Sequence, residues 1–297
     1  MSDPILNNVS DKPESTNLLS RIWLSVLFLA CSLAIFLLGA NYYRLFPTNG
    51  SWVYAGSLAV FFLVVALLLR HSVKLAKYWP IFYAFFVASG VNLVSDLFAG
   101  YNSQFVQLFG TWTGTNQGFA LAKLYDALLV VIPILALTLI SGENLDSLFL
   151  KKGNLNWKWG LGIGTLVLMN FMTSSLIFFG TGYDISKLGA AIVWGIVFSL
   201  SNSMLEELWI RGLFLKKLVP LIGVAWTVVL SSVWFASLHF LAVAYLPAMV
   251  IPVFVVNTFT LGLACAILMI KTDSIWGAFL IHAAADLFLF IAILAVH

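Results

Sequence analysis

Charged residues are scarce in this sequence. Only 9% of its 297 residues are Asp, Glu, Lys or Arg, whereas 62% are hydrophobic and the mean hydropathy is +1.02. Water-soluble domains carry about a quarter charged residues, so this composition excludes a soluble fold. Cysteine is scarce too. Cys31 and Cys265 both lie in apolar runs, where a thiol behaves as a small hydrophobic side chain, and no disulfide framework is expected.

A concentrated basic surface is also missing. The net charge is only +3, and the basic residues are scattered between apolar runs. Proteins that bind nucleic acid gather Lys and Arg on one face or along one helix. The sequence therefore predicts no nucleic-acid partner, and its apolar composition predicts a lipid bilayer as its surroundings.

Long apolar runs fill almost the whole chain. Each run has roughly 18 to 23 residues, enough to cross about 30 Å of hydrocarbon as an α-helix. A membrane barrel would show alternating strands instead of continuous apolar runs. We therefore predict an all-α, polytopic transmembrane helical bundle of about eight or nine spans. The runs are residues 22–40, 52–69, 79–98, 119–141, 158–180, 187–210, 222–240, 248–270 and 274–295.

The chain divides into three parts by composition. Residues 1–20 are polar and predict a disordered tail, residues 21–180 hold the first five spans, and residues 181–297 hold the last four. Basic residues fall in alternate connections, which include Arg70 to Lys77, Lys151 to Lys158, Arg211 to Lys217 and Lys271. By the positive-inside rule this side is cytoplasmic. We expect a multi-pass integral membrane protein of a bacterial cell membrane with its N-terminus in the cytoplasm.

Ionisable residues inside the last spans are the main functional signal. Each costs at least about 2.5 kcal/mol at the bilayer centre, and such residues tend to mark function and to face a polar interior. They predict an intramembrane polar cavity in the C-terminal part. The residues are Glu206 and Glu207 in the sixth span, with Arg211 directly after it, His239 in the seventh, and His282 and Asp286 in the ninth.

Helical spacing gives these residues a geometry. Glu207 and Arg211 are four residues apart and can form an ion pair on one helix face, whereas Glu206 points about 100° away from that pair. His282 and Asp286 are also four residues apart, so the carboxylate can orient the imidazole. If Glu206, His239 and His282 surround one water-filled cavity, they form a hydrolase constellation that can deprotonate water and stabilise an oxyanion.

The predicted membrane depths of Glu206 and His239 conflict with a shared cavity. Counting 1.5 Å per residue from the span boundaries places Glu206 near the cytoplasmic face and His239 near the opposite one. The two residues reach a common depth if the sixth helix runs on through Leu218 and the seventh begins below the membrane surface. We expect this extension. Among the other polar residues, Asn202, Ser203 and Asn257 can line the cavity or join helices, and we favour the second role.

Three motifs in this order resemble those of the CAAX-protease and bacteriocin-processing family of intramembrane endopeptidases, also called the abortive-infection family. The resemblance covers about residues 187–295, includes Gly212 directly after the arginine, and leaves the first five spans outside it. The motifs are Glu-Glu-x-x-x-Arg at Glu206, Glu207 and Arg211, Phe-x-x-x-His at Phe235 and His239, and His-x-x-x-Asn/Asp at His282 and Asp286.

This resemblance implies an endopeptidase that cleaves a peptide or protein substrate at or within the membrane, with a site open to the cytoplasm. It implies that Glu206 is the general base, that His239 helps to activate water, and that His282 and Asp286 stabilise the oxyanion. Glu207 and Arg211 become supporting residues. The family often has Asn at the last position, and an ionised Asp286 cannot donate a hydrogen bond. Asp286 is therefore either protonated or orients His282.

Several alternatives remain open at this point. One Glu and two His also make the ligand set of catalytic zinc, so zinc bound by Glu206, His239 and His282 stands beside a glutamate mechanism that needs no cofactor. A catalytically silent relative that binds or chaperones membrane partners is a second function. An ion-coupled transporter is a third, and it would predict inverted repeats with broken helices. Asp96 and the neighbouring pair Lys123 and Asp126 have no place in any of these readings.

Overall fold

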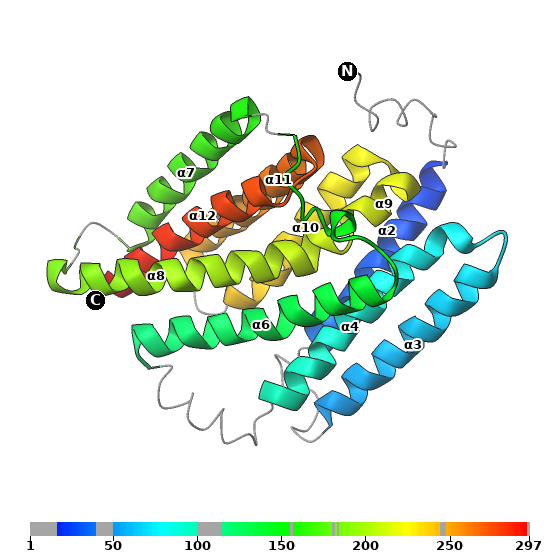
Figure 1. Ribbon diagram of the computed structural model, residues 1–297. Coiled ribbons are helices and arrows are strands. Elements are labelled where there is room, and N and C mark those ends of the chain that lie inside the picture. Colours follow the sequence, from blue (N-terminus) through cyan, green and yellow to red (C-terminus); the bar gives the residue numbers. More distant parts are fainter. Residues whose placement is uncertain are drawn as a thin grey trace.

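The computed structural model describes residues 17–39, 50–99, 114–154, 157–179, 182, 184–243 and 248–295. Over these residues the secondary structure consists of helices and turns without a strand (Figure 1), which confirms the predicted all-α class. The predicted tail lies outside the described residues up to residue 16. Its last residues belong to the first helix, which begins at Leu18 with the side chain of Asn17 as its N-cap.

Each of the nine predicted spans corresponds to a helix, and one further short helix follows the sixth span. Two of the helices continue directly into π-helical turns, α2 into η1 and α8 into η4. The helices are α2 (Leu18–Ser32, then η1, Leu33–Leu38), α3 (Ser51–His71), α4 (Trp79–Ala99), α6 (Asn116–Ile140), α7 (Trp157–Phe179), α8 (Ile185–Glu206, then η4, Glu207–Gly212), α9 (Leu215–Ile222), α10 (Val224–Val243), α11 (Ile251–Thr272) and α12 (Trp276–Ala295).

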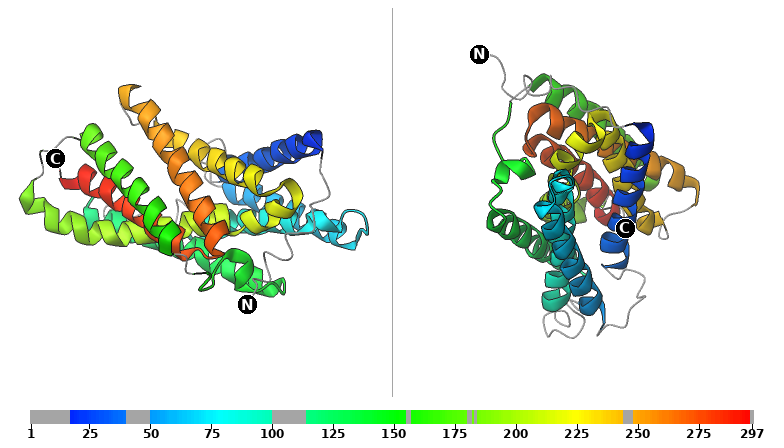
Figure 2. Two further views of the ribbon diagram at one scale, coloured as in Figure 1. Left: turned by 90° about the horizontal axis from the view of Figure 1, so that it is seen from above. Right: turned by 90° about the vertical axis from the view of Figure 1, so that its right-hand side faces the viewer.

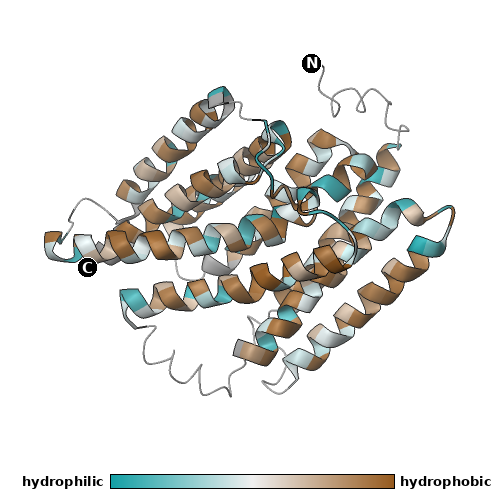
Figure 3. Ribbon diagram, in the orientation of Figure 1, coloured by the Kyte–Doolittle hydropathy of each residue, from teal (hydrophilic) through white to brown (hydrophobic). Residues whose placement is uncertain are grey.

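The described helices have the length and composition of membrane spans. Seven helical segments are long and apolar enough to cross a bilayer, and two shorter apolar segments lie at Val224–Phe240 and Trp276–Ile291. Hydrophobic residues cover most of their length, with polar residues gathered near several helix ends (Figure 3). The protein is therefore a polytopic helical bundle.

The C-terminal helices form a tightly packed group. Helix α12 packs on α8, α7 and α11, and α10 packs on α11, so residues far apart in sequence lie together (Figures 1 and 2). Helix α6 joins this group to α4 by packing on both α8 and α4, while α3 lies at the edge against α4.

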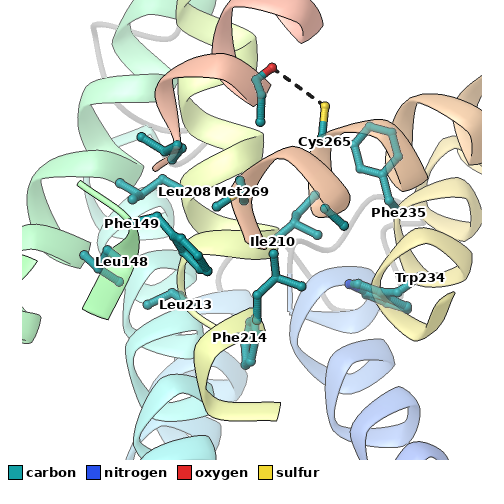
Figure 4. Close-up of a cluster of buried hydrophobic side chains, with 14 of the residues drawn as sticks. Leu148, Phe149, Leu208, Ile210, Leu213, Phe214, Trp234, Phe235, Cys265 and Met269 are labelled. Carbon is teal, nitrogen blue, oxygen red and sulfur yellow. Dashed lines mark hydrogen bonds between the residues drawn. The ribbon is translucent and has the colours of Figure 1, made fainter. Parts of the chain in front are cut away.

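A buried apolar cluster lies where these helices meet the segment that follows α8 (Figure 4). Leu208, Ile210 and Phe214 of this segment pack with side chains of α10 and α11, among them Trp234 and Met269. All five side chains are at most 4% exposed. This cluster holds the chain rigidly on both sides of Arg211, and it therefore fixes the polar residues that come just before it.

Charged residues of α9 and of the connections after α6 and α11 meet at one end of the bundle. Asp273, after α11, pairs with both Lys151 and Lys216, and Lys217 lies 3.2 Å from Glu143. The backbone N–H of Ile275 also donates to a carbonyl of the connection after α6, at 2.9 Å. These contacts agree with the alternation of basic loops in the sequence. The assignment of this end to the cytoplasm stays a prediction.

Candidate active site

The helix that carries Glu206 continues well past it. Helix α8, the π-helical turn η4 and helix α9 follow one another to Ile222, and α10 begins at Val224. Gly223, with φ of +86°, makes the turn between α9 and α10. The sixth helix does not run on unbroken through Leu218 as expected, because η4 ends at Gly212, residues 213–214 form a turn and α9 is a separate helix. The helical stretch to Ile222 nevertheless returns the chain so that Glu206 and His239 lie side by side, 3.9 Å apart, which removes the conflict between the two depths.

Glu206 and Glu207 stand at the point where the helix widens. The backbone N–H of Leu213 bonds to the carbonyl of Leu208, five residues back, at 3.1 Å, as in a π-helix. Such wide turns occur often at functional sites. Gly212 closes the turn, and a Cβ there would lie 3.1 Å from the Leu208 side chain and 3.4 Å from a backbone oxygen of Leu148. The glycine after the arginine is therefore explained by close packing.

A fully buried polar network supports the site from within. The guanidinium of Arg211 hydrogen-bonds Oε1 of Glu207, and the same oxygen lies 2.7 Å from Nδ1 of His282. All three side chains are at most 1% exposed. The arginine also lies over the ring of Phe235, 4.2 Å from its centroid, a favourable cation–π arrangement. A carboxylate only accepts hydrogen bonds, so Glu207 holds the proton of His282 on Nδ1 and turns Nε2 outward.

The residue that orients His282 is Glu207 and not Asp286, which the sequence analysis had considered for this role. Asp286 was expected to orient His282 from one helical turn away, but its Oδ1 lies on the Nε2 side of the ring, at 3.6 Å. Glu207, from another helix, occupies the Nδ1 side. No spacing in the sequence signals a contact between residues 75 positions apart, so this role of Glu207 was missed.

The outward-facing atoms converge on one carboxylate oxygen. Oε2 of Glu206 lies 3.9 Å from Nε2 of His239 and 3.7 Å from Nε2 of His282. These distances exceed direct hydrogen bonds and suit groups bridged by water. Among the described residues, this oxygen has no hydrogen-bond partner. The side chains of Glu206, His239 and Asp286 are 18%, 25% and 16% exposed, although Oε2 of Glu206 is itself buried. This half of the site therefore borders the surface, whereas the supporting half is sealed.

The Phe-x-x-x-His motif has a structural explanation. Nδ1 of His239 lies 2.9 Å from the backbone carbonyl oxygen of Phe235, one helical turn back. Because a carbonyl only accepts, the ring proton sits on Nδ1, and Nε2 is free to accept a hydrogen bond from water. The ring of Phe235 packs against both imidazoles, with centroids 4.4 Å from His239 and 5.5 Å from His282. Phe235 is thus a packing residue at the centre of the site.

Asn202 is a further polar residue of the site. Its side-chain amide donates to Oδ2 of Asp286 at 3.0 Å and so joins α8 to α12, as expected. Asn257 also joins helices, because it bonds Asn170 and Ser174 of α7. Ser203 instead bonds the backbone of its own helix, so the expectation that it joins helices is wrong.

The remaining ionisable residues of the spans do not contact this cluster. Lys123 and Asp126 pair within α6 at 3.8 Å, as their spacing predicts. Asp96 of α4 lies beside Ser51 at the start of α3. Outside the spans, Asp184 caps α8, and hydrogen bonds from Ser186 hold the pKa of its carboxyl group below the usual value.

The donor atoms were compared with the needs of a zinc ion. Glu206, His239 and His282 offer an oxygen and two Nε2 atoms, and each imidazole is held through Nδ1 by an acceptor, as metal-bound histidines usually are. The chemistry of the three donors suits zinc, but among the described residues this trio is not a set whose donor atoms all lie within 4.8 Å of one another.

A second set, Glu207, Cys265 and His282, has donor atoms within 4.8 Å of one another. Its atoms are already engaged, since Glu207 binds Arg211 and His282, and Cys265 donates to a backbone oxygen of α12 at 3.7 Å. We therefore interpret this second set as part of the supporting network.

Comparisons with known proteins agree with this site. A family model described as Rce1-like, type II CAAX prenyl endopeptidase Rce1-like, matches residues 188–288, which is about a third of the chain and contains every site residue from Glu206 to Asp286. No curated protein and no solved structure matches the chain. The match confirms the resemblance carried by the three motifs: over residues 188–288 this chain has the sequence pattern of the Rce1-like CAAX endopeptidases.

Proposed function

We propose that this protein is an intramembrane endopeptidase that hydrolyses a peptide bond with water activated by Glu206 and His239. One observation carries the proposal. A carboxylate oxygen without a hydrogen-bond partner among the described residues faces the Nε2 atoms of two oriented imidazoles at distances that leave room for water. The family match over residues 188–288 supports peptidase activity as the purpose of this arrangement.

The proposed reaction begins with a water molecule between Glu206 and His239. Glu206 takes a proton from this water as its oxygen bonds to the carbonyl carbon of the substrate. The resulting oxyanion is stabilised by a hydrogen bond from Nε2 of His282. Glu206 then passes its proton to the amide nitrogen, the carbon–nitrogen bond breaks, and a carboxyl group and an amine leave.

His282 must carry two protons to play this part. Its Nδ1–H is bound by Glu207, so a hydrogen bond to the oxyanion needs a second proton on Nε2. The carboxylates of Glu206 and Asp286, at 3.7 and 3.6 Å, favour the charged imidazolium. Asp286 then acts on His282 through the negative charge of its own carboxylate. The hydrogen bond from Asn202 fixes the position of that carboxylate.

Zinc is the competing form of the same proposal. An ion bound by Glu206, His239 and His282 would itself activate a bound water molecule and polarise the substrate carbonyl. Under the glutamate mechanism the protein needs no cofactor. The two forms share their residues and differ in their response to chelators.

The experiment is cleavage of an unbiased peptide library by the purified protein in detergent, read by mass spectrometry. Native protein is compared with Glu206→Ala and His239→Ala, and with Asp184→Asn as a matched control outside the spans. Cleavage that both alanine variants abolish and that a strong chelator spares supports the glutamate mechanism. Chelator-sensitive cleavage restored by zinc supports the metal form. Folded protein that cleaves no peptide would overturn the proposal in favour of a silent protein that binds or chaperones membrane partners.

The location and the orientation belong to the same proposal. Seven apolar helical segments and the family match support an integral membrane protein. We place the site near the cytoplasmic side of a bacterial cell membrane, with the N-terminus in the cytoplasm, because the basic connections gather at the end that contains Lys151, Lys216 and Lys217. Labelling of single cysteines introduced into the connections from either side of the membrane tests this orientation.

A further inference from the structure

A second cavity lies among the N-terminal helices, away from the polar site. It has a volume of about 300 Å³, is open on part of its surface and is lined by α3, α4 and α6. Its walls are largely aliphatic and aromatic, and polar groups occur at one end. The lining residues are Leu63, Ala66, Leu67 and Arg70 of α3, Trp79, Tyr83 and Phe86 of α4, and Leu137, Ile140 and Ser141 at the end of α6.

The cavity exists because α3 and α6 each pack on α4. Helix α3 lies at the edge of the bundle and packs mainly on α4, whereas α6 packs on the other side of α4 and on α8 (Figure 1). The space between α3 and α6 is therefore bounded by protein on three sides. In a membrane, an apolar space that opens to the hydrocarbon suits a lipid chain better than water, because its walls offer packing and few hydrogen bonds.

The polar end of the cavity carries one exposed cation. Arg70, in the last turn of α3, lies over the ring of Trp79 at 5.0 Å, and no carboxylate among the described residues pairs with it. Glu143, two residues after the lining residue Ser141, is already paired with Lys217. The hydroxyl of Tyr83 points to a backbone oxygen of α6 at 2.7 Å, so it is also engaged.

The sequence around this cation is free of negative charge. Positions 15–95 contain no Asp or Glu, while Arg70, Lys74 and Lys77 follow one another in the connection between α3 and α4. A Trp at the first residue of α4 is typical of the region where hydrocarbon meets head groups. An apolar cavity thus ends at a cationic, interfacial rim, which suits a molecule with a hydrocarbon chain and a negative head group.

We propose that this cavity binds one anionic phospholipid. Its acyl chain lies between α3 and α6 along Leu67 and Leu137, and its phosphate contacts Arg70. The bound lipid joins the peripheral helix α3 to α6. The proposal does not depend on peptidase activity, since the cavity has no residue in common with the polar site.

The experiment counts lipids retained by the purified protein in native mass spectrometry, with phosphatidylglycerol and phosphatidylcholine supplied in turn. Native protein is expected to retain one phosphatidylglycerol in preference to phosphatidylcholine. Arg70→Ala is expected to weaken this binding about fivefold, the usual effect of one cation near anionic lipid. Lys74→Ala also removes one positive charge, four residues further along the chain, but Lys74 does not line the cavity. This variant is expected to leave the binding unchanged.

A second pair of variants tests the apolar part. Leu67→Trp fills the cavity and is expected to prevent retention of the lipid, whereas Leu68→Trp places the same ring on the more exposed neighbouring position, which is 68% exposed, and is expected to have no effect. Equal retention of the two lipids by the native protein would overturn the proposal. So would binding that Arg70→Ala and Lys74→Ala change alike, or binding that survives Leu67→Trp.

Discussion

In the buried network of Arg211, Glu207 and His282, we predict that Glu207 and Arg211 contribute unequally to stability. Removing one partner of a buried ion pair costs about 3–5 kcal/mol, because the other charge is left buried without compensation. In Glu207→Ala the guanidinium keeps, among the described residues, the ring of Phe235, a contact that contributes roughly 0.5–2 kcal/mol. His282 loses its partner at Nδ1 in the same variant, which offsets that remaining contact. We therefore expect nearly the full loss of about 3–5 kcal/mol for Glu207→Ala.

Arg211→Ala leaves a different situation. The carboxylate of Glu207 keeps its contact with Nδ1 of His282 at 2.7 Å, and a charge-assisted hydrogen bond contributes about 1.5–3 kcal/mol. The expected loss for Arg211→Ala is then about 2 kcal/mol, clearly smaller than for Glu207→Ala. The double variant Glu207→Leu with Arg211→Met buries no charge, and we expect it to recover most of the stability without recovering activity, because His282 loses its orienting partner.

Thermal unfolding in detergent, followed by circular dichroism, measures the order of these variants. The expected order of melting temperature is native protein, then the double variant, then Arg211→Ala, then Glu207→Ala. If the melting temperature of Arg211→Ala is equal to or lower than that of Glu207→Ala, the account is refuted, because the bond between Glu207 and His282 then does not compensate for the loss of Arg211. Full peptidase activity in the double variant would refute the role of Glu207 in orienting His282.

Further predictions concern the last site position and one tight turn. Asp286→Asn removes the charge that favours the imidazolium of His282, and we expect cleavage to fall by about tenfold or more; cleavage that rises would indicate instead that an amide donor is better at this position. Asn202→Ala leaves Asp286 charged but unfixed, so the expected loss is smaller, and the two rates are compared in the same peptide assay. Gly153→Ala is expected to lower the melting temperature more than Gly142→Ala. Both glycines have positive φ, but a Cβ on Gly153 would lie 2.3 Å from a backbone oxygen at the end of α11, whereas Gly142 has open space; equal melting temperatures would show that the close approach does not contribute.

Much of the fold follows from the apolar runs. Their lengths indicate helices that span a membrane, and each predicted run is a helix in the structure. Helix ends were less certain, since α2 begins at Leu18 instead of residue 22 and the eight-residue helix α9 was expected only as an extension. Side chains on a lipid-facing surface are as apolar as those of the core, so hydropathy does not show which faces meet. The cavity between α3 and α6 could not be anticipated for this reason.

The parts of the site that depend on residue spacing within one helix could be predicted from the sequence. Helical periodicity predicts that Glu206 points away from the Glu207–Arg211 pair. It also predicts that His282 and Asp286 lie close together on one face. Individual partners across helices depend on packing and could not be assigned, although the gathering of Glu206, His239 and His282 was expected. The bond from Glu207 to His282 and the bond from Asn202 to Asp286 each join residues more than 70 positions apart. A buried carboxylate beside a buried histidine was the only signal, and it did not identify the partners.

The measurement that tests the central claim most directly is the rate of peptide cleavage by Glu206→Gln. Glutamine keeps the size of the side chain and its place beside the imidazoles of His239 and His282, but it cannot take a proton from water. The account predicts an unchanged melting temperature and a loss of cleavage of at least about 10² to 10⁴. Cleavage by the folded Glu206→Gln protein at the native rate would contradict it.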